Sequence, residues 1–185
     1  MKPFRIRELQ MTDVQALLAF EIHNREWFES QIDARDPAFY SWTGVTEHIE
    51  GYLADFAVGV WHPFVIEDGS GRIVGRANLK DIHPADGCAQ VGYRIDQDFC
   101  RQGLATLALE HLIRQARMRW ALTQLVAYVY EQNVGSRKVL ERCGFVAAPR
   151  LPGEEAEEGC RFVLAVQAAR EAVLTNQYCD CTAVL

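Results

Sequence analysis

The chain has 185 residues, 49% of them hydrophobic and 24% charged, a balance that predicts one domain with a filled core and argues against disorder. Its formal net charge of -6 argues against a non-specific nucleic-acid binder, which needs a basic surface. No stretch approaches the roughly 20 apolar residues of a membrane span, and residues 1–12 lack the apolar run of an export signal, so we expect a cytoplasmic protein without a nucleic-acid or membrane partner.

The first part of the chain predicts one strand and two helices. Phe4–Leu9 alternates between apolar and charged residues, as a half-buried strand does. Thr12 and Asp13 then favour the start of a helix. The segment Arg25–Trp42 is aromatic and charged, and we expect a loop or a broken helix there, followed by a second helix over Val45–Val58.

A run of antiparallel strands follows. Trp61–Glu67 is apolar, and the turn residues Asp68–Gly71 predict a hairpin with the return strand Arg72–Leu79. A second turn over His83–Gly87 leads into a third strand, Cys88–Asp96. These segments predict a meander of three strands.

The pattern then changes to a helical period. Gly103–Trp120 predicts a long amphipathic helix, and Leu125–Tyr130 predicts a strand buried on both faces. Asn133–Cys143 predicts another helix, which Gly144 ends. The last expected elements are strands at Phe145–Ala148 and Cys160–Val166, before a tail at 167–185. This order predicts an α+β, or mixed α/β, domain with one central twisted sheet covered by helices.

Six cysteines are present, but we expect no disulfide framework because the chain shows no export signal. Cys179 and Cys181 form the one close pair, and the histidine partners expected of a zinc site are missing nearby. We therefore predict two tail thiols and no metal. Cys100 and Cys143 have no histidine placed locally to activate them as nucleophiles.

The first segment with a chemical signature is Asp96–Thr106, which joins a strand to the long helix. Gly103 and Ala105 are small residues that let a phosphate approach free backbone N–H groups at the helix N-terminus. Arg101 adds a full positive charge. The segment is neither a Walker A loop nor a Rossmann fingerprint. An ordinary strand–helix turn is the alternative interpretation.

The second segment is Asn133–Phe145. Asn133 is placed to cap the helix, and Ser136 lies one turn further, so its hydroxyl is expected at the helix mouth. A capped amphipathic helix with a glycine stop is the alternative, and it explains Asn133 and Gly144 without any chemistry.

Together the two segments resemble the GNAT superfamily of acetyltransferases. Gly103 and Ala105 match the end of its motif A, and Gly92–Asp96 looks like the fourth strand that leads into it. Its motif B is matched at Asn133, Ser136, Val139, Leu140, Gly144 and Phe145. The resemblance covers residues 4–166 and implies a mixed sheet of about seven strands with strands 4 and 5 splayed. We expect the whole chain, residues 1–185, to be one such domain.

Within the superfamily the chain is most similar to the RimJ/RimL kind, the ribosomal-protein N-terminal alanine acetyltransferases and their relatives. The opening strand Arg5–Leu9 with Asp13, and the segment from Asn24 to Tyr40, carry this finer resemblance. Two residues depart from the superfamily pattern. Cys100 stands where motif A usually has Gln or Arg, and Leu140 stands where many members have a tyrosine that protonates the leaving thiolate.

The resemblance implies direct attack by a neutral amine on the thioester of acetyl-CoA, without a metal. Ser136, with Asn133 beside it, is the nearest replacement for the missing tyrosine. The implied cofactor-binding residues are Arg94, Ile95, Cys100, Arg101, Gln102, Gly103, Leu104, Ala105, Thr106, Asn133 and Ser136. The acceptor-side candidates are Glu21, Asn24, Arg35 and Tyr40, of which Arg35 is suited to a carboxylate or a peptide carbonyl.

The acceptor and the general base stay open. A protein or peptide N-terminus is the leading acceptor, and the alternatives are a small amine, such as an amino acid, polyamine or antibiotic, or a non-catalytic acyl-CoA-binding module. The fourth strand offers Gln90 and Asp96, and the turn before it offers His83 and Asp86, but none stands out as the base. A homodimer is the base-rate expectation for a soluble enzyme.

Overall fold

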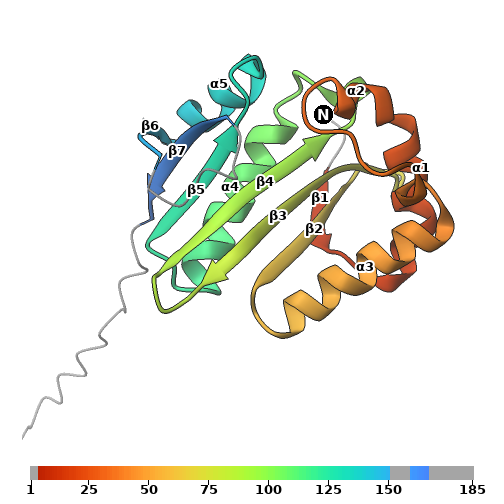
Figure 1. Ribbon diagram of the computed structural model, residues 1–185, viewed down its shortest axis with the longest axis horizontal. Coiled ribbons are helices and arrows are strands. Elements are labelled where there is room, and N and C mark those ends of the chain that lie inside the picture. The colour runs from red at the N-terminus through yellow and green to blue at the C-terminus, as the bar shows by residue number, and fades with distance from the viewer. Residues whose placement is uncertain (1–3, 151–158, 167–185) are drawn as a thin grey trace, which may run out of the picture.

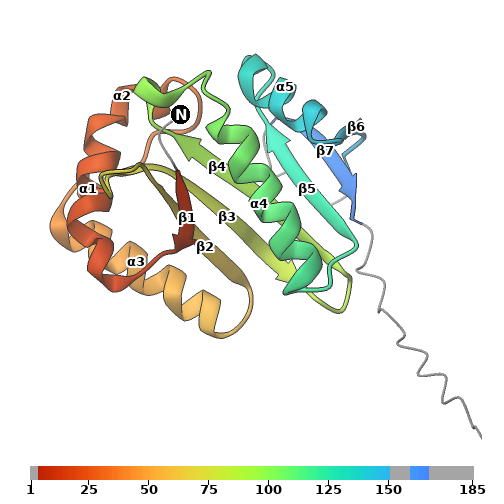
Figure 2. The same cartoon turned by 180° about the vertical axis from the view of Figure 1, so that it is seen from behind.

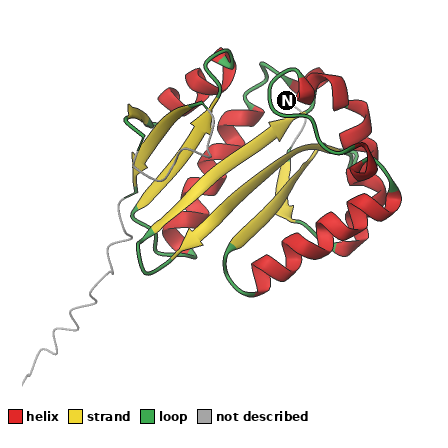
Figure 3. Ribbon diagram, viewed as in Figure 1, coloured by secondary structure: helices red, strands yellow, loops and turns green. Residues whose placement is uncertain are grey.

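The computed structural model describes residues 4–150 and 159–166 and contains one seven-stranded sheet in the order β1-β2-β3-β4-β5-β7-β6 (Figures 1 and 3). All neighbouring strands are antiparallel except β4 and β5, so the sheet is mixed, as predicted. The strands are β1 (Arg5–Glu8), β2 (Trp61–Glu67), β3 (Ile73–His83), β4 (Cys88–Ile95), β5 (Gln124–Val129), β6 (Val146–Ala148) and β7 (Cys160–Ala165).

Helices cover both faces of this sheet. The long helix α4 lies across one face together with α5, and the N-terminal helices lie against the other (Figures 1 and 2). The α-helices are α1 (Val14–His23), α2 (Arg25–Glu29), α3 (Trp42–Ala57), α4 (Leu104–Met118) and α5 (Val134–Arg142). Three short 3-10 helices are η1 (Met11–Asp13), η2 (Pro37–Phe39) and η3 (Gln97–Phe99). No helix among the described residues has the length and apolar character needed to cross a membrane.

Two apolar clusters fill the space on either side of the sheet, because successive side chains of a strand point to opposite faces. On β2, Phe64 and Ile66 join the larger cluster under α4, whereas Val65 joins the smaller cluster under α1 and α3. Leu109 and Leu112 of α4 are both fully buried against the larger cluster. The helical and two-residue periods seen in the sequence therefore place these residues in the core.

The sheet opens between β4 and β5. These parallel strands pair only from Cys88–Gln124 to Gln90–Val126, although β4 continues to Ile95 and β5 to Val129. The splayed strands that the resemblance implied are thus present. The opening exposes backbone groups of both strands at the end of the sheet where α4 and α5 begin.

Several boundaries differ from the predicted ones for local reasons. Helix α3 begins at Trp42 instead of Val45, since the Ser41 hydroxyl accepts a hydrogen bond from the Gly44 N–H at 3.0 Å and caps the helix. Strand β3 runs on to His83 because it keeps pairing with β4 as far as Cys88. The segment predicted as a loop or broken helix contains α2 and η2. The tail at 167–185 and its two cysteines lie outside the described residues.

Candidate functional site

The N-terminus of α4 is open and unobstructed. Gly103 precedes the helix in the left-handed region at φ 85°, which glycine tolerates at little cost. A Cβ atom built at Gly103 would meet nothing within 4 Å. The first turn, Leu104–Thr106, carries backbone N–H groups that have no partner inside the helix. These groups and the helix dipole suit an anion such as a phosphate.

The loop before α4 holds its own side chains in place. The carboxylate of Asp96 accepts a hydrogen bond from the Asp98 N–H at 3.0 Å, and the Gln102 side chain donates to the Asp98 carbonyl at 3.0 Å. Arg101 is exposed and adopts φ 61°. Burial and the nearby Asp96 raise the pKa of the Cys100 thiol, so it stays protonated at neutral pH and is a poor nucleophile.

Helix α5 has the cap and the stop that its sequence predicts. The Asn133 side-chain oxygen accepts from the Ser136 N–H at 3.0 Å. Gly144 adopts φ 89°, and the Phe145 N–H donates to the Leu140 carbonyl at 3.0 Å, as in a glycine C-cap. Leu140 is only 1% exposed and belongs to the core under α4.

Two cavities meet at the opening between β4 and β5. The first, which we call the helix-end cavity, has a volume of about 610 Å³ and is lined by the start of α4, the start of α5 and the end of β4. The second, the sheet cavity, has a volume of about 520 Å³ and lies over β3, β4 and the end of β5. Both cavities are lined by Ile32, Tyr93, Arg94, Asn133 and Ser136.

Of the eleven cofactor residues that the resemblance implied, ten line the helix-end cavity. Gln102 does not; its side chain turns back onto Asp98. The two predicted catalytic residues, Asn133 and Ser136, lie where the two cavities join. The geometry therefore brings these residues together, while their roles stay predictions.

Tyr93 lies at the same junction and was not singled out from the sequence. Its hydroxyl oxygen is buried beside the Ser136 hydroxyl. Burial raises the pKa of Tyr93 to about 12, and the Ser136 hydroxyl opposes part of that rise. Tyr93 is thus a protonated hydroxyl beside Ser136.

The floor of the sheet cavity is a polar ladder across β3 and β4. Arg76 pairs with Arg94, Asn78 with Gly92, and Lys80 with Gln90 in the strand register. A Cβ atom at Gly92 would meet nothing within 4 Å, so the middle of the ladder is open. The alternation of Arg76, Asn78 and Lys80 with the buried Ala77 and Leu79 was a visible signal that one face of β3 is polar.

A buried carboxylate lies behind this ladder. Glu21 of α1 is fully buried, and its carboxylate accepts a very short hydrogen bond from Arg76 and one from Arg94 at 3.3 Å. Although burial would raise the pKa of Glu21, Arg76, Arg94 and Arg35 together hold it below its usual value. Glu21 lines neither cavity.

The second partner of Arg76 is a neutral histidine. The Arg76 guanidinium donates to His48 Nε2 at 2.8 Å. Burial and the nearby arginines lower the pKa of His48 to about 2, so the ring accepts this hydrogen bond without a charge. Glu21 and His48 therefore fix Arg76 from two sides.

Only Arg35 of the four acceptor-side candidates lines the sheet cavity. The Asn24 side chain donates to the Phe20 carbonyl at 2.9 Å and accepts from the Gln97 N–H at 2.9 Å, so it joins α1 to the loop before α4. The Tyr40 hydroxyl donates to Glu29 at 3.3 Å. Acceptor contacts by Glu21, Asn24 and Tyr40 remain predictions.

The groups weighed as a general base line neither cavity. His83 ends β3 and Asp86 lies in the turn before β4, at the other end of β4 from Tyr93. Asp96 is buried, and its carboxylate accepts from Arg72 at 2.6 Å. Gln90 pairs with Lys80 in the ladder and has a buried side-chain oxygen, but it does not line the cavity.

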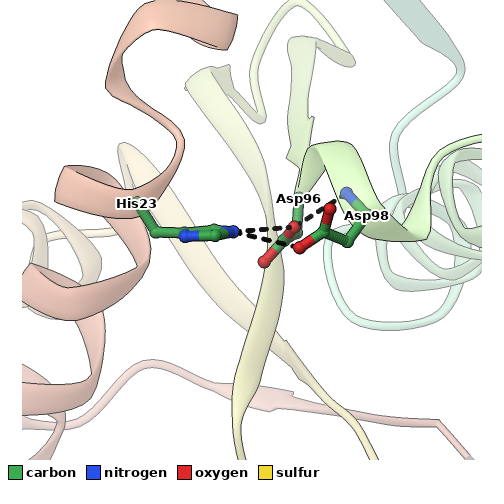
Figure 4. A group of neighbouring side chains, drawn as sticks. All are labelled: His23, Asp96 and Asp98. Atoms are coloured by element: carbon green, nitrogen blue, oxygen red, sulfur yellow. Dashed lines mark hydrogen bonds and ion pairs between the residues drawn. The ribbon is translucent and has the colours of Figure 1, made fainter.

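His23, at the end of α1, forms a cluster with Asp96 and Asp98 of the loop before α4 (Figure 4). His23 Nε2 lies 3.1 Å from an Asp98 carboxylate oxygen and 3.9 Å from one of Asp96. The Asp96 carboxylate already has two further partners, because it accepts hydrogen bonds from Arg72 and from the Asp98 N–H. The cluster joins α1 to the loop before α4.

The family model described as an acetyltransferase (GNAT) domain matches residues 4–146 of this chain. A probable N-acetyltransferase of Bacillus subtilis (strain 168), YjcK, is 29% identical over 146 residues, which is 78% of this chain and 81% of that protein. The residues matched by the family model include all those that line the two cavities.

Solved structures share the fold at lower identity. The ribosomal-protein-S5-alanine acetyltransferase from Vibrio fischeri has a TM-score of 0.80 and 18% identity, over 90% of this chain and 97% of that chain. Spermidine N-acetyltransferase from Vibrio cholerae, solved with CoA and spermine, has a TM-score of 0.69 and 19% identity, over 88% of this chain and 95% of that chain. One fold thus carries protein and small-amine acceptors.

Proposed function

Because the chain belongs to the GNAT family of acetyltransferases and transfers acetyl groups from acetyl-CoA, we propose that its acceptor is the amine of a protein or peptide N-terminus, attacking the thioester directly. The observation that carries this proposal is the meeting of two cavities at Tyr93, Arg94 and Ser136. One cavity ends on an open helix N-terminus, and the other presents a polar face of the sheet. The acetylated nitrogen is expected at their junction.

The residues at the helix-end cavity fit acetyl-CoA. The open space at Gly103 and the free N–H groups of the first turn of α4 suit its pyrophosphate, and Arg101 adds a positive charge. Arg94 and Ile95 pair with β3 but lie beyond the last β4–β5 pair, so their backbone groups on the side of β5 are available to the rest of the acetyl-CoA molecule. When bound, acetyl-CoA supplies an acetyl thioester, whose C–S bond is exchanged for an amide C–N bond while the acceptor nitrogen loses a proton and the sulfur gains one.

Ser136 is the residue that we propose as the proton donor to the sulfur. Its backbone N–H donates to Asn133, so the helix cap does not need the hydroxyl, which lies beside Tyr93 at the junction. Tyr93 stands beside it with a pKa of about 12 and stays protonated. Leu140, which stands where many members of the family have a tyrosine, is buried in the core. In our proposal the hydroxyls of Ser136 and Tyr93 take the place of that tyrosine.

The sheet cavity favours the reactive, neutral form of the amine without a dedicated base. Arg35, Arg76, Lys80 and Arg94 line it, whereas Asp33 is its one acidic lining residue in the described part of the chain. Positive charges nearby lower the pKa of an ammonium group, since they disfavour its protonated form. A water molecule is then sufficient to carry the proton away.

A small amine is the second candidate acceptor. The Tyr130 hydroxyl donates to an Asp33 carboxylate oxygen at 2.7 Å, and both residues line the sheet cavity. This hydrogen bond joins the segment after α2 to the loop after β5 and narrows the space that a peptide needs.

Thiol release from acetyl-CoA tests the proposal. The purified protein is assayed with peptides that start with Ala or Ser and with a panel of small amines. Activity on peptides supports the N-terminal acceptor, and activity confined to one small amine supports the second candidate. Silence across the panel would contradict both acceptors, and CoA titration by calorimetry then tests the cofactor site separately.

A further inference from the structure

The sheet cavity carries more positive charge than its own carboxylates neutralise. Arg35, Arg76 and Arg94 surround Glu21, the one carboxylate buried behind them in the part of the chain that the structure describes. Burial and repulsion from Arg35 and Arg76 lower the pKa of Arg94 to about 10. Burial and repulsion from Arg76 likewise lower the pKa of Arg35. All three remain cations at neutral pH, so the cluster is short of negative charge.

Among the described residues, two basic side chains that line the sheet cavity, Arg35 and Lys80, have no carboxylate partner. Arg35 lies over the Phe39 ring at 4.1 Å, and its Nε is buried without a hydrogen bond. Lys80 lines the far end of the ladder and makes none of the ion pairs found among the described residues. The cavity's one acidic lining residue, Asp33, accepts a hydrogen bond from Tyr130.

Other unpaired polar groups concentrate in the same cavity. Buried atoms without a hydrogen bond include Arg35 Nε, Trp61 Nε1 and Asn78 Oδ1, and all three residues line the sheet cavity. Buried polar groups are normally paired, so such a group in a cavity marks a place for a polar ligand. Two of the three atoms belong to N–H donors, as an anion requires.

This positive charge is separate from the cofactor's phosphate site. Arg35, Arg76 and Lys80 line the sheet cavity alone, whereas Arg101 and the start of α4 line the helix-end cavity alone. Arg94 is the basic residue common to both. The unpaired cations therefore face the space that the acceptor occupies.

We propose that the sheet cavity binds a carboxylate of the acceptor, so that the substrate is an amine that also carries a carboxylate near the acetylated nitrogen. Arg35 and Lys80 bind the carboxylate, and Arg76, fixed by Glu21 and His48, supplies a rigid positive background. This inference rests on the proposed function and narrows its substrate class. Two sources share the chemistry: the α-carboxylate of a free amino acid, and an acidic side chain beside a peptide N-terminus.

The same charges disfavour polyamines. A polycation in the sheet cavity meets Arg35, Arg76, Lys80 and Arg94 with only Asp33 and the buried Glu21 to offset them. The formal net charge of -6 describes the whole surface and would draw cations to the protein. The local charge of the cavity opposes that attraction at short range, where it decides which ligand binds.

Matched acceptors that differ in one group test the proposal by binding. Calorimetry with the CoA-loaded protein compares the amidated dipeptide Ser-Glu with Ser-Gln, and free serine with serinamide; spermidine is the polycation. We expect at least one carboxylate acceptor to bind about tenfold more tightly than its uncharged match. The dipeptide pair reports a side-chain carboxylate, and the serine pair reports an α-carboxylate. Spermidine should bind most weakly.

Variants then assign the preference to residues. Arg35→Gln and Lys80→Gln change half-buried side chains without removing a buried ion pair, so both are expected to fold. Each should reduce the preference to about threefold or less, while the Kd for CoA stays unchanged because neither residue lines the helix-end cavity. Arg117→Gln, an exposed change in the last turn of α4, removes one positive charge elsewhere and should keep the full preference.

The outcomes separate this inference from the proposed function. Equal binding in both pairs, or tightest binding of spermidine, would overturn the carboxylate site even if amines are acetylated. A preference that survives both Arg35→Gln and Lys80→Gln would also overturn it. Carboxylate-dependent binding without any thiol release would support the carboxylate site and contradict the proposed acetyl transfer to that acceptor.

Discussion

Ser136 combines a structural and a chemical position in one residue. Its N–H completes the cap of α5 by donating to Asn133, and its hydroxyl faces the junction of the cavities. Because the cap uses the backbone, the hydroxyl can be removed without disturbing the start of the helix. A mutation at this residue therefore tests chemistry separately from folding.

Ser136→Ala is expected to lower kcat by about 100-fold, the low end of what a positioned proton donor usually contributes. The KM for acetyl-CoA should change by less than about twofold, because the contacts at α4 remain. Steady-state thiol release measures both constants. Ser136→Thr keeps a hydroxyl and should recover much of kcat; an alanine variant as fast as the parent protein would remove Ser136 from the chemistry.

Glu21 shows the opposite case, a charged residue whose surroundings make it structural. Its fully buried carboxylate compensates Arg76, which is 2% exposed. Glu21→Gln keeps the shape of the side chain but leaves Arg76 without a counter-charge. We expect the free energy of unfolding to fall by about 3–5 kcal/mol, as when one partner of a buried pair is removed. Urea denaturation measures this change.

A matched control for that measurement lies on α3. Glu50 is exposed, so Glu50→Gln removes the same charge from the surface and should change the free energy of unfolding by less than about 0.5 kcal/mol. If Glu21→Gln were as mild as this control, the buried network would not depend on the carboxylate.

At the scale of elements, the start of α4 depends on a glycine with free space around it. Gly103→Leu fills that space, so the Kd for CoA should rise by about tenfold or more because the side chain keeps the phosphates from the helix N-terminus. The substitution also strains the backbone, since Gly103 has φ 85°. Calorimetric titration with CoA measures the affinity.

Gly71, in the turn between β2 and β3, provides the matching control for strain. It has φ 84°, a Cβ atom there would meet nothing within 4 Å, and it lines neither cavity. Gly71→Leu should lose a similar amount of stability and keep its CoA affinity. Equal CoA affinity in the two variants would contradict the assignment of the α4 N-terminus to the phosphates.

The whole molecule is expected to lose stability on mild acidification. Burial lowers the pKa of His48 to about 2 and that of His111 to about 4, and it also lowers the pKa of His62. The unfolded chain binds protons at these residues below about pH 6.5, whereas the folded chain does not. The contribution of these neutral histidines to the free energy of unfolding is therefore complete above about pH 6.5 and is lost as the pH falls below it.

Urea midpoints at about pH 7.5 and about pH 5 measure this effect within a range where carboxylates stay largely ionised. Each buried histidine lowers the free energy of unfolding by up to about 1.4 kcal/mol per pH unit below its unfolded pKa. His48→Asn removes one such group and should make the pH dependence shallower. A midpoint that is unchanged or higher at the acidic pH would contradict the burial of neutral histidines.

The fold and the residues of the helix-end cavity could be predicted because the features that indicate them are local in the sequence. Gly103 begins α4, Asn133 caps α5 and Gly144 ends it, and each of these effects involves residues within a few positions. Hydropathy periods likewise identify the strands, because alternation and helical spacing arise from backbone geometry. The boundary of α3 differed because Ser41 forms a cap that the apolar pattern does not reveal.

The acceptor side could not be predicted in this way, because its charges are balanced by residues far apart in the chain. Glu21 meets Arg76 across 55 positions and Arg94 across 73 positions. Asn24, predicted as an acceptor contact, forms hydrogen bonds that join α1 to the loop before α4, and contact with the acceptor remains a prediction. The sequence determined the family, the fold and the open N-terminus of α4, which we propose binds the phosphates, through short-range backbone physics. The packing of α1 on the sheet decided which cations remain unpaired, since charge compensation depends on distance in space.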